Sequence, residues 1–164
     1  MLVMLVAVNS VVSPKISKMS KNEEYNDIEK LLRFSSLCTF LPALFIGCIL
    51  FVYGESMLLL LYGDEYVSAV SVLYVICLTH VVNSYFGPVM VAMNMLGRES
   101  ISLYAVVVSL LVTCTLGELM VTKHGALGVA IAVLVGVFIW NTILAVGLYR
   151  IYGINCIPKL TAKL

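Results

Sequence analysis

Residues 66–97 read YVSAVSVLYVICLTHVVNSYFGPVMVAMNMLG and contain no Asp, Glu, Lys or Arg. Crossing the roughly 30 Å hydrocarbon layer of a bilayer takes about 20 helical residues, each rising about 1.5 Å. The stretch is longer than one perpendicular crossing requires, so tilt or a kink at Gly87-Pro88 must absorb the surplus. We therefore predict one long transmembrane helix over residues 66–97.

Further apolar stretches lie on both sides of this one. Residues 34–53 and 124–149 are each long enough for one crossing, and so are residues 101–121, which only Glu118 interrupts. Residues 1–14 are apolar but too short to cross, so we predict a truncated transmembrane helix there. The predicted fold is all-α, a multi-pass transmembrane helical bundle with four full spans.

The composition favours a membrane protein over a soluble one. Hydrophobic residues make up 62% of the chain and charged residues 12%, whereas soluble domains have about 45–50% and about 25%. A net charge of +1 without a basic stripe gives no support for a nucleic-acid partner. The five cysteines include no close pair, so no disulfide framework and no metal site is predicted.

Lysine and arginine decide the predicted orientation. Residues 15–33 carry five of them and residues 54–65 carry none, and such residues concentrate in cytoplasmic loops. We therefore predict a cytoplasmic loop at 15–33, an outer turn at 54–65 with an interfacial segment at 57–62, and a cytoplasmic tail at 150–164.

The loop at 15–33 is predicted to contain an amphipathic helix that begins at a capping box formed by Ser20 and Glu23. Glu29 and Arg33 are spaced to pair one turn apart on this helix. One side of this helix, mostly apolar, is formed at helical spacing by Ile28, Leu31, Leu32 and Ser35.

The last predicted span carries small residues at regular spacing. Gly128, Ala132 and Gly136 follow one another every four residues and so lie on one face of a helix. In lipid, small residues at this spacing let two helices approach closely. We expect close packing of this span against a neighbour, although glycine and alanine are also common in spans without such a role.

The long predicted helix carries a polar stripe. His80, Asn83, Ser84, Gly87 and Asn94 project within one sector about 80–100° wide at about 100° per residue. A polar face within a span faces a helix interface or a water-filled cavity rather than lipid. We predict that the first four residues line a cavity. The alternative for His80 is a neutral imidazole bonded to a neighbouring helix, and for Asn94 a position at the cytoplasmic interface.

Two other polar residues are candidates for lining the same cavity. Glu118 is the single carboxylate within a predicted span, and it can instead snorkel or pair with Lys123. Asn141, beside Trp140, can instead form a hydrogen bond between helices. The chain has no nucleophile motif, no HExxH and no phosphate loop, so neither enzymatic chemistry nor a cofactor is predicted.

Several segments together resemble the polysaccharide-biosynthesis flippases of the multidrug/oligosaccharidyl-lipid/polysaccharide exporter superfamily. They are VSPKISKM (12–19), LPALFIGCIL (41–50), LLLYGDEYVSAVSVLYVICL (59–78), GPVMVAMNMLGRES (87–100), KHGALGVAIAV (123–133) and LYRIYGI (148–154). The resemblance implies the later part of the second of two six-helix lobes in a MATE-like fold, with the first lobe missing from this chain. It also implies a bacterial-type cytoplasmic membrane as the location.

The resemblance implies a function as well. Such flippases move a polyprenyl pyrophosphate-linked oligosaccharide from the cytoplasmic to the outer leaflet by alternating access. A pyrophosphate needs basic or hydrogen-bonding groups in a hydrated cavity, and this chain has no Arg or Lys within its predicted spans. We therefore expect a pyrophosphate-binding cation to lie in the missing lobe, and we transfer no binding residue from the family.

Three other functions stay open at the level of sequence. A multidrug or organic-cation exporter of the same superfamily would favour acidic residues deep in the spans. A membrane-embedded glycosyl- or acyltransferase would require a cluster of Asp, Glu or His at a membrane boundary. A small structural subunit would act through helix packing alone. The chain upstream would distinguish these, because a preceding apolar lobe of similar pattern excludes a small subunit.

Overall fold

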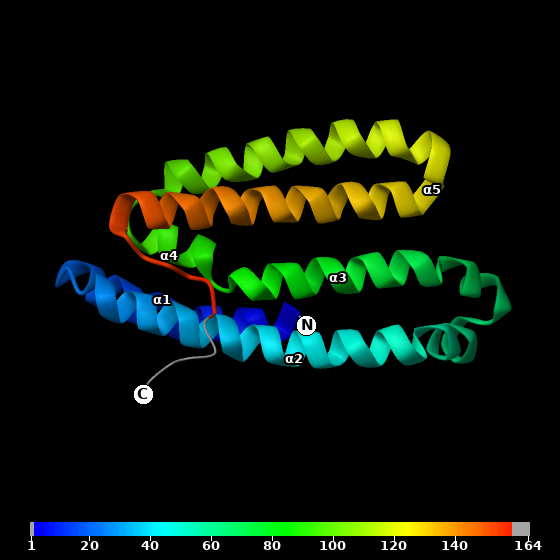
Figure 1. Ribbon diagram of the computed structural model, residues 1–164, viewed down its shortest axis with the longest axis horizontal. Coiled ribbons are helices and arrows are strands. Elements are labelled where there is room, and N and C mark those ends of the chain that lie inside the picture. Colours follow the sequence, from blue (N-terminus) through cyan, green and yellow to red (C-terminus); the bar gives the residue numbers. More distant parts are fainter. Residues whose placement is uncertain (1, 159–164) are drawn as a thin grey trace.

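The computed structural model describes residues 2–158, and every regular element in that range is helical (Figure 1). Three stretches, Tyr25–Tyr62, Asp64–Phe86 and Glu99–Tyr152, are long and apolar enough to cross a membrane. Residue 1 and residues 159–164, which belong to the predicted first helix and tail, lie outside the described residues. The elements are α1 (Leu2–Lys21), α2 (Tyr25–Tyr62), the 3-10 helix η1 (Asp64–Ala69), α3 (Val70–Phe86), α4 (Val89–Met95) and α5 (Glu99–Tyr152).

Helix α5 doubles back at Gly125 and forms two antiparallel legs (Figure 1). Gly125 has φ 55° and ψ −137°, a combination that glycine tolerates and that residues with a Cβ rarely adopt. The first leg, residues 99–124, contains the span predicted at 101–121, and the second leg, residues 126–152, contains the span predicted at 124–149 except for its first two residues. Each leg is long enough to reach across a bilayer.

The continuous helix predicted over residues 66–97 is wrong. The chain forms η1 first, then α3, which ends at Phe86, and then the short α4. Gly87 has φ 63° and ψ −146°, which is not helical, and Pro88 has no N–H to continue the hydrogen-bond ladder. Of the two predicted ways to absorb the surplus length, tilt or a kink at Gly87-Pro88, the chain uses the second, as a full break in the helix.

The reversal between the first two helices also differs from the prediction. Helix α1 runs through Pro14 to Lys21, so Ser20 lies in its last turn and caps no helix. Helix α2 begins after Glu24 without a capping side chain. The chain reverses at Glu23, whose φ of 57° turns the backbone out of α1.

Helix α2 continues without interruption to Tyr62. Residues 57–62 are therefore its last turns and not a separate interfacial segment. At its other end, the predicted apolar side is confirmed in part, because Ile28, Leu32 and Ser35 are buried while Leu31 is partly exposed.

The main apolar core lies at the end of the bundle that carries Lys21, Arg98 and Arg150, here called the basic end. The α1–α2 turn, the α4–α5 turn and the C-terminal end of α5 meet there (left in Figure 1). Many side chains elsewhere on the helices are large, apolar and exposed, for example Leu60 at 85%, as expected for helices surrounded by lipid. The core consists of Val12, Ile16, Ile28, Leu32, Val89, Ala92, Met93, Ala105, Leu144, Leu148, Ile154 and Cys156.

The two legs of α5 pack closely through small residues, as predicted. Gly128, Ala132 and Gly136 are all buried. The Ser109 hydroxyl on the first leg donates a 2.8 Å hydrogen bond to the Gly136 carbonyl on the second. A Cβ at Gly136 would collide with the Thr113 side chain. The absence of a side chain at Gly136 is therefore a condition for this contact.

The segment after α5 folds back over the basic end and docks on α2. Gly153, with φ 69°, ends α5 in the left-handed conformation typical of a helix C-terminus. Ile154 and Cys156 follow it into the core, where they are 1% and 2% exposed. Burial raises the pKa of the Cys156 thiol to about 11.

An ion pair on α2 holds this docked segment. Arg33 and Glu29 form the predicted pair, with 2.6 Å between their nearest nitrogen and oxygen. The backbone N–H of Asn155 donates to Glu29 Oε2 at 3.0 Å, and Arg33 Nε donates to the Asn155 carbonyl at 3.1 Å. The Ser36 hydroxyl lies 3.2 Å from the Cys156 carbonyl. The pair therefore links α2 to the end of α5.

Candidate functional site

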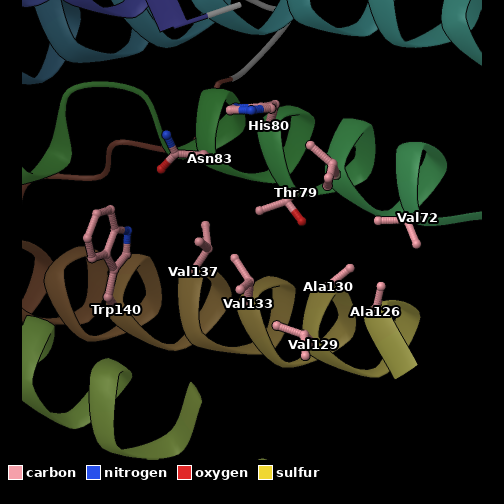
Figure 2. A pocket seen from close by; sticks show the side chains of 11 residues that line it. Val72, Thr79, His80, Asn83, Ala126, Val129, Ala130, Val133, Val137 and Trp140 are labelled. Atoms are coloured by element: carbon pink, nitrogen blue, oxygen red, sulfur yellow. The ribbon is translucent and has the colours of Figure 1, made fainter. Parts of the chain in front are cut away.

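A cavity of about 450 Å³ lies between α3 and the second leg of α5 (Figure 2). Most of its wall is aliphatic, and its polar side chains are Thr79, His80, Asn83 and Trp140. None of the eleven lining residues is Asp, Glu, Lys or Arg. The lining is formed by Val72, Ile76, Thr79, His80 and Asn83 of α3 and by Ala126, Val129, Ala130, Val133, Val137 and Trp140 of α5.

Asn141 and Asn83 connect the two walls of the cavity. Asn141 Nδ2 donates to Asn83 Oδ1 at 3.0 Å and to the Val137 carbonyl of its own helix at 2.9 Å. Asn141 is 2% exposed, so this amide pair lies where water is scarce and the bond is correspondingly valuable. Because Asn83 accepts through its oxygen, its amide nitrogen is left for another partner.

Three polar groups at the cavity have no partner among residues 2–158. The Asn83 amide nitrogen and the His80 ring take part in no hydrogen bond as donors or acceptors. The Trp140 Nε1–H is buried and unpaired. Figure 2 shows the Trp140 ring rising from α5 toward Asn83. Thr79 differs, since its hydroxyl donates to the Val75 carbonyl of its own helix at 2.8 Å.

The predicted polar stripe is divided between two neighbours. His80 and Asn83 face the cavity, and Asn141 joins them from α5. Ser84 and Gly87 instead contact α2 through their backbone, and the Ser84 carbonyl accepts from the Thr39 hydroxyl at 3.0 Å. A Cβ at Gly87 would collide with Ser36 of α2. A sector about 80–100° wide is broad enough to meet two helices, which explains the division.

The remaining candidates lie elsewhere. Glu118 is exposed on the first leg of α5 and forms no ion pair with Lys123 within the described part of the chain. Asn94 lies on α4, with its side-chain oxygen buried and unpaired. Neither residue lines the cavity between α3 and α5.

Sequence reasoning did not select Trp140 or Thr79 as cavity residues. The signal for Trp140 was present, because Val133, Val137 and Trp140 follow at the spacing of one helical face. That face was not recognisable as a cavity wall without knowing that α3 lies opposite to it.

The chemistry available at this site is hydrogen bonding without ionised groups. Over residues 2–158, no three His, Cys, Asp or Glu side chains are grouped so that they could hold a metal ion.

Comparison of the chain with protein-family models, with curated proteins and with solved structures gave no match.

Proposed function

We propose that this chain is part of a membrane transport protein that flips lipid-linked oligosaccharide or a polysaccharide precursor across the cytoplasmic membrane by alternating access. The observation that carries the proposal is the cavity between α3 and α5, where unpaired polar groups face a space between apolar helices. The order and spacing of the segments that resemble polysaccharide flippases support it from the sequence side.

A transport path must offer polar groups to a substrate that hydrocarbon excludes. Unpaired polar groups within a bilayer cost several kcal/mol each, so they are retained mainly where they serve a cavity or path. His80 and the Asn83 amide are of this kind. A purely structural subunit would instead be expected to pair or remove them.

The arrangement of the helices suggests how such a path would open. The apolar core and the docked segment after α5 join the helices at the basic end. The cavity extends from Asn83 and Trp140 toward Val72 and Ala126, near the turns at the other end (Figure 2). We propose that the basic end is cytoplasmic and that a second lobe completes the transport path.

The test is reconstitution of the full-length protein that contains this chain into liposomes with a fluorescent lipid-linked oligosaccharide. A lectin added outside reports how much glycan is exposed in the outer leaflet over time. We expect protein-dependent movement between the leaflets. Uptake of an organic cation such as ethidium without glycolipid movement would favour a multidrug exporter. The absence of both activities would favour a structural subunit.

A further inference from the structure

We propose that the cavity between α3 and α5 binds an uncharged amphiphile, a ligand with an apolar chain and a neutral oxygen that accepts hydrogen bonds. In a flippase this ligand would be the lipid chain together with a neutral polar group, while the pyrophosphate binds elsewhere. The inference names the part of the substrate that this cavity holds and in that sense rests on the proposed function.

The wall of the cavity fits an apolar chain. Side chains of valine, alanine and isoleucine line it from the end near Val72 and Ala126 up to Val137 (Figure 2). Such a surface gains free energy by contact with hydrocarbon and offers nothing to a glycan. The polar groups are confined to one part of the cavity, around His80, Asn83 and Trp140.

The polar part offers mainly hydrogen-bond donors. Asn141 occupies the Asn83 oxygen, so Asn83 presents its N–H groups. The His80 ring also faces the cavity without a partner, and a neutral imidazole donates through one nitrogen and accepts through the other. Unpaired donors on both Asn83 and His80, against a single acceptor nitrogen on His80, favour a ligand carbonyl or hydroxyl oxygen over a ligand N–H.

The lack of charge in the lining excludes an anionic head group as the preferred ligand. A phosphate within a medium of low dielectric requires a nearby cation or several donors. No lining residue is Lys or Arg, and two neutral donors do not compensate a full charge. An ester carbonyl or a hydroxyl needs only the donors that are present.

The single tryptophan of the chain makes the test direct, because Trp140 lies in the cavity wall. The full-length protein is placed in nanodiscs, and quenching of tryptophan fluorescence by chain-brominated probes is measured against probe mole fraction. The probes are a monoacylglycerol, an alkyl glucoside, an alkane and an alkyl phosphate. Tryptophans in other parts of the full-length protein are replaced by phenylalanine.

We expect saturable quenching by the monoacylglycerol or the glucoside, at a mole fraction at least tenfold lower than for the alkane or the phosphate. A preference between the two identifies the source of the oxygen as an ester or as a sugar hydroxyl. In Asn83→Leu the saturable component should be lost. In Thr115→Val, which removes a hydroxyl from an exposed position on the other leg of α5, it should be unchanged.

Quenching that rises linearly and equally for all four probes would overturn the proposal, because it would describe ordinary contact with lipid. Stronger quenching by the alkyl phosphate would overturn it as well, since the site would then prefer an anion. If Asn83→Leu fails to fold, the comparison among the four probes in the parent protein still decides whether the cavity prefers an uncharged amphiphile. Saturable binding without flipping by the parent protein would contradict the proposed function and leave this inference standing. Flipping without saturable binding would contradict this inference and leave the proposed function standing.

Discussion

Replacing Arg33 by alanine should release the segment that follows α5 and expose the thiol of Cys156. Arg33 donates to the Asn155 carbonyl and neutralises Glu29, whose side chain is 25% exposed. Its loss removes one hydrogen bond and leaves a half-buried carboxylate without its cation, which together cost about 1–3 kcal/mol. A change of this size raises the ratio of released to docked molecules by about 5- to 150-fold.

The chemistry of the thiol sets the size of the signal. Docked Cys156 has a pKa of about 11 against an ordinary value of 9.0. At pH 8 these values correspond to thiolate fractions of about 0.1% and about 10%, and only the thiolate reacts rapidly. Maleimide labelling of Cys156 should therefore become faster by up to about 100-fold in the variant.

The assay uses protein in which Cys38, Cys48, Cys77 and Cys114 are replaced by alanine, so that Cys156 is the single thiol of the chain. The time course of maleimide labelling at pH 8 is compared among the parent, Arg33→Ala and Lys30→Ala. Lys30 is the matched control, because it is a basic residue on the same helix whose ion pair with Asp27 is exposed. Equal labelling rates in the parent and Arg33→Ala, or equal acceleration in both variants, would refute the conclusion that the Arg33–Glu29 pair holds the segment after α5.

Three further predictions concern the stability of the fold and its orientation in the membrane. The folded-state pKa of Cys156 is raised to about 11, so the protonated thiol stabilises the fold fully below about pH 9. As pH rises from about 9 toward 11, the free energy of unfolding should fall by about 3 kcal/mol in all. Cys156→Ser should remove this pH-dependent loss of thermal stability. Gly136→Ala should lower the free energy of unfolding by about 1–3 kcal/mol through overpacking, as measured by melting in detergent. Gly117→Ala is the control and should leave the free energy of unfolding unchanged, because its new Cβ would lie 3.8 Å from the nearest atom. Finally, a cysteine at Asp64 should react with an impermeant reagent added outside cells and one at Lys21 should not; labelling of position 64 only from the cytoplasm would reverse the proposed orientation.

Much of the helical framework could be predicted from local patterns. The absence of charge placed the legs of α5, and the spacing of Gly128, Ala132 and Gly136 predicted a close helix contact that the structure contains. These features depend on residues near one another in the sequence. Composition and periodicity are therefore sufficient to find them.

The docked segment and the neighbours of each polar residue could not be predicted in the same way. Local sequence indicated a kink at Gly87-Pro88, and α3 does end there, but the contact of Gly87 with Ser36 of α2 joins distant parts of the chain. The polar stripe indicated that His80 avoids lipid, but it could not tell which neighbour each residue faces. Asn155 pairs with Glu29 across more than a hundred residues, and no local pattern encodes such a contact.

We propose that the cavity between α3 and α5 forms part of the transport path and holds the lipid chain of the substrate, and leaflet exchange in cavity variants tests this proposal most directly. The full-length protein is reconstituted with fluorescent lipid-linked oligosaccharide as parent, as the double variant His80→Leu and Asn83→Leu, and as Val82→Leu, which lies on α3 outside the cavity lining. We expect the double variant to flip at least tenfold more slowly than the parent and Val82→Leu to match the parent. Full activity of a correctly folded double variant would contradict the claim and leave His80 and Asn83 as polar residues that serve helix packing alone.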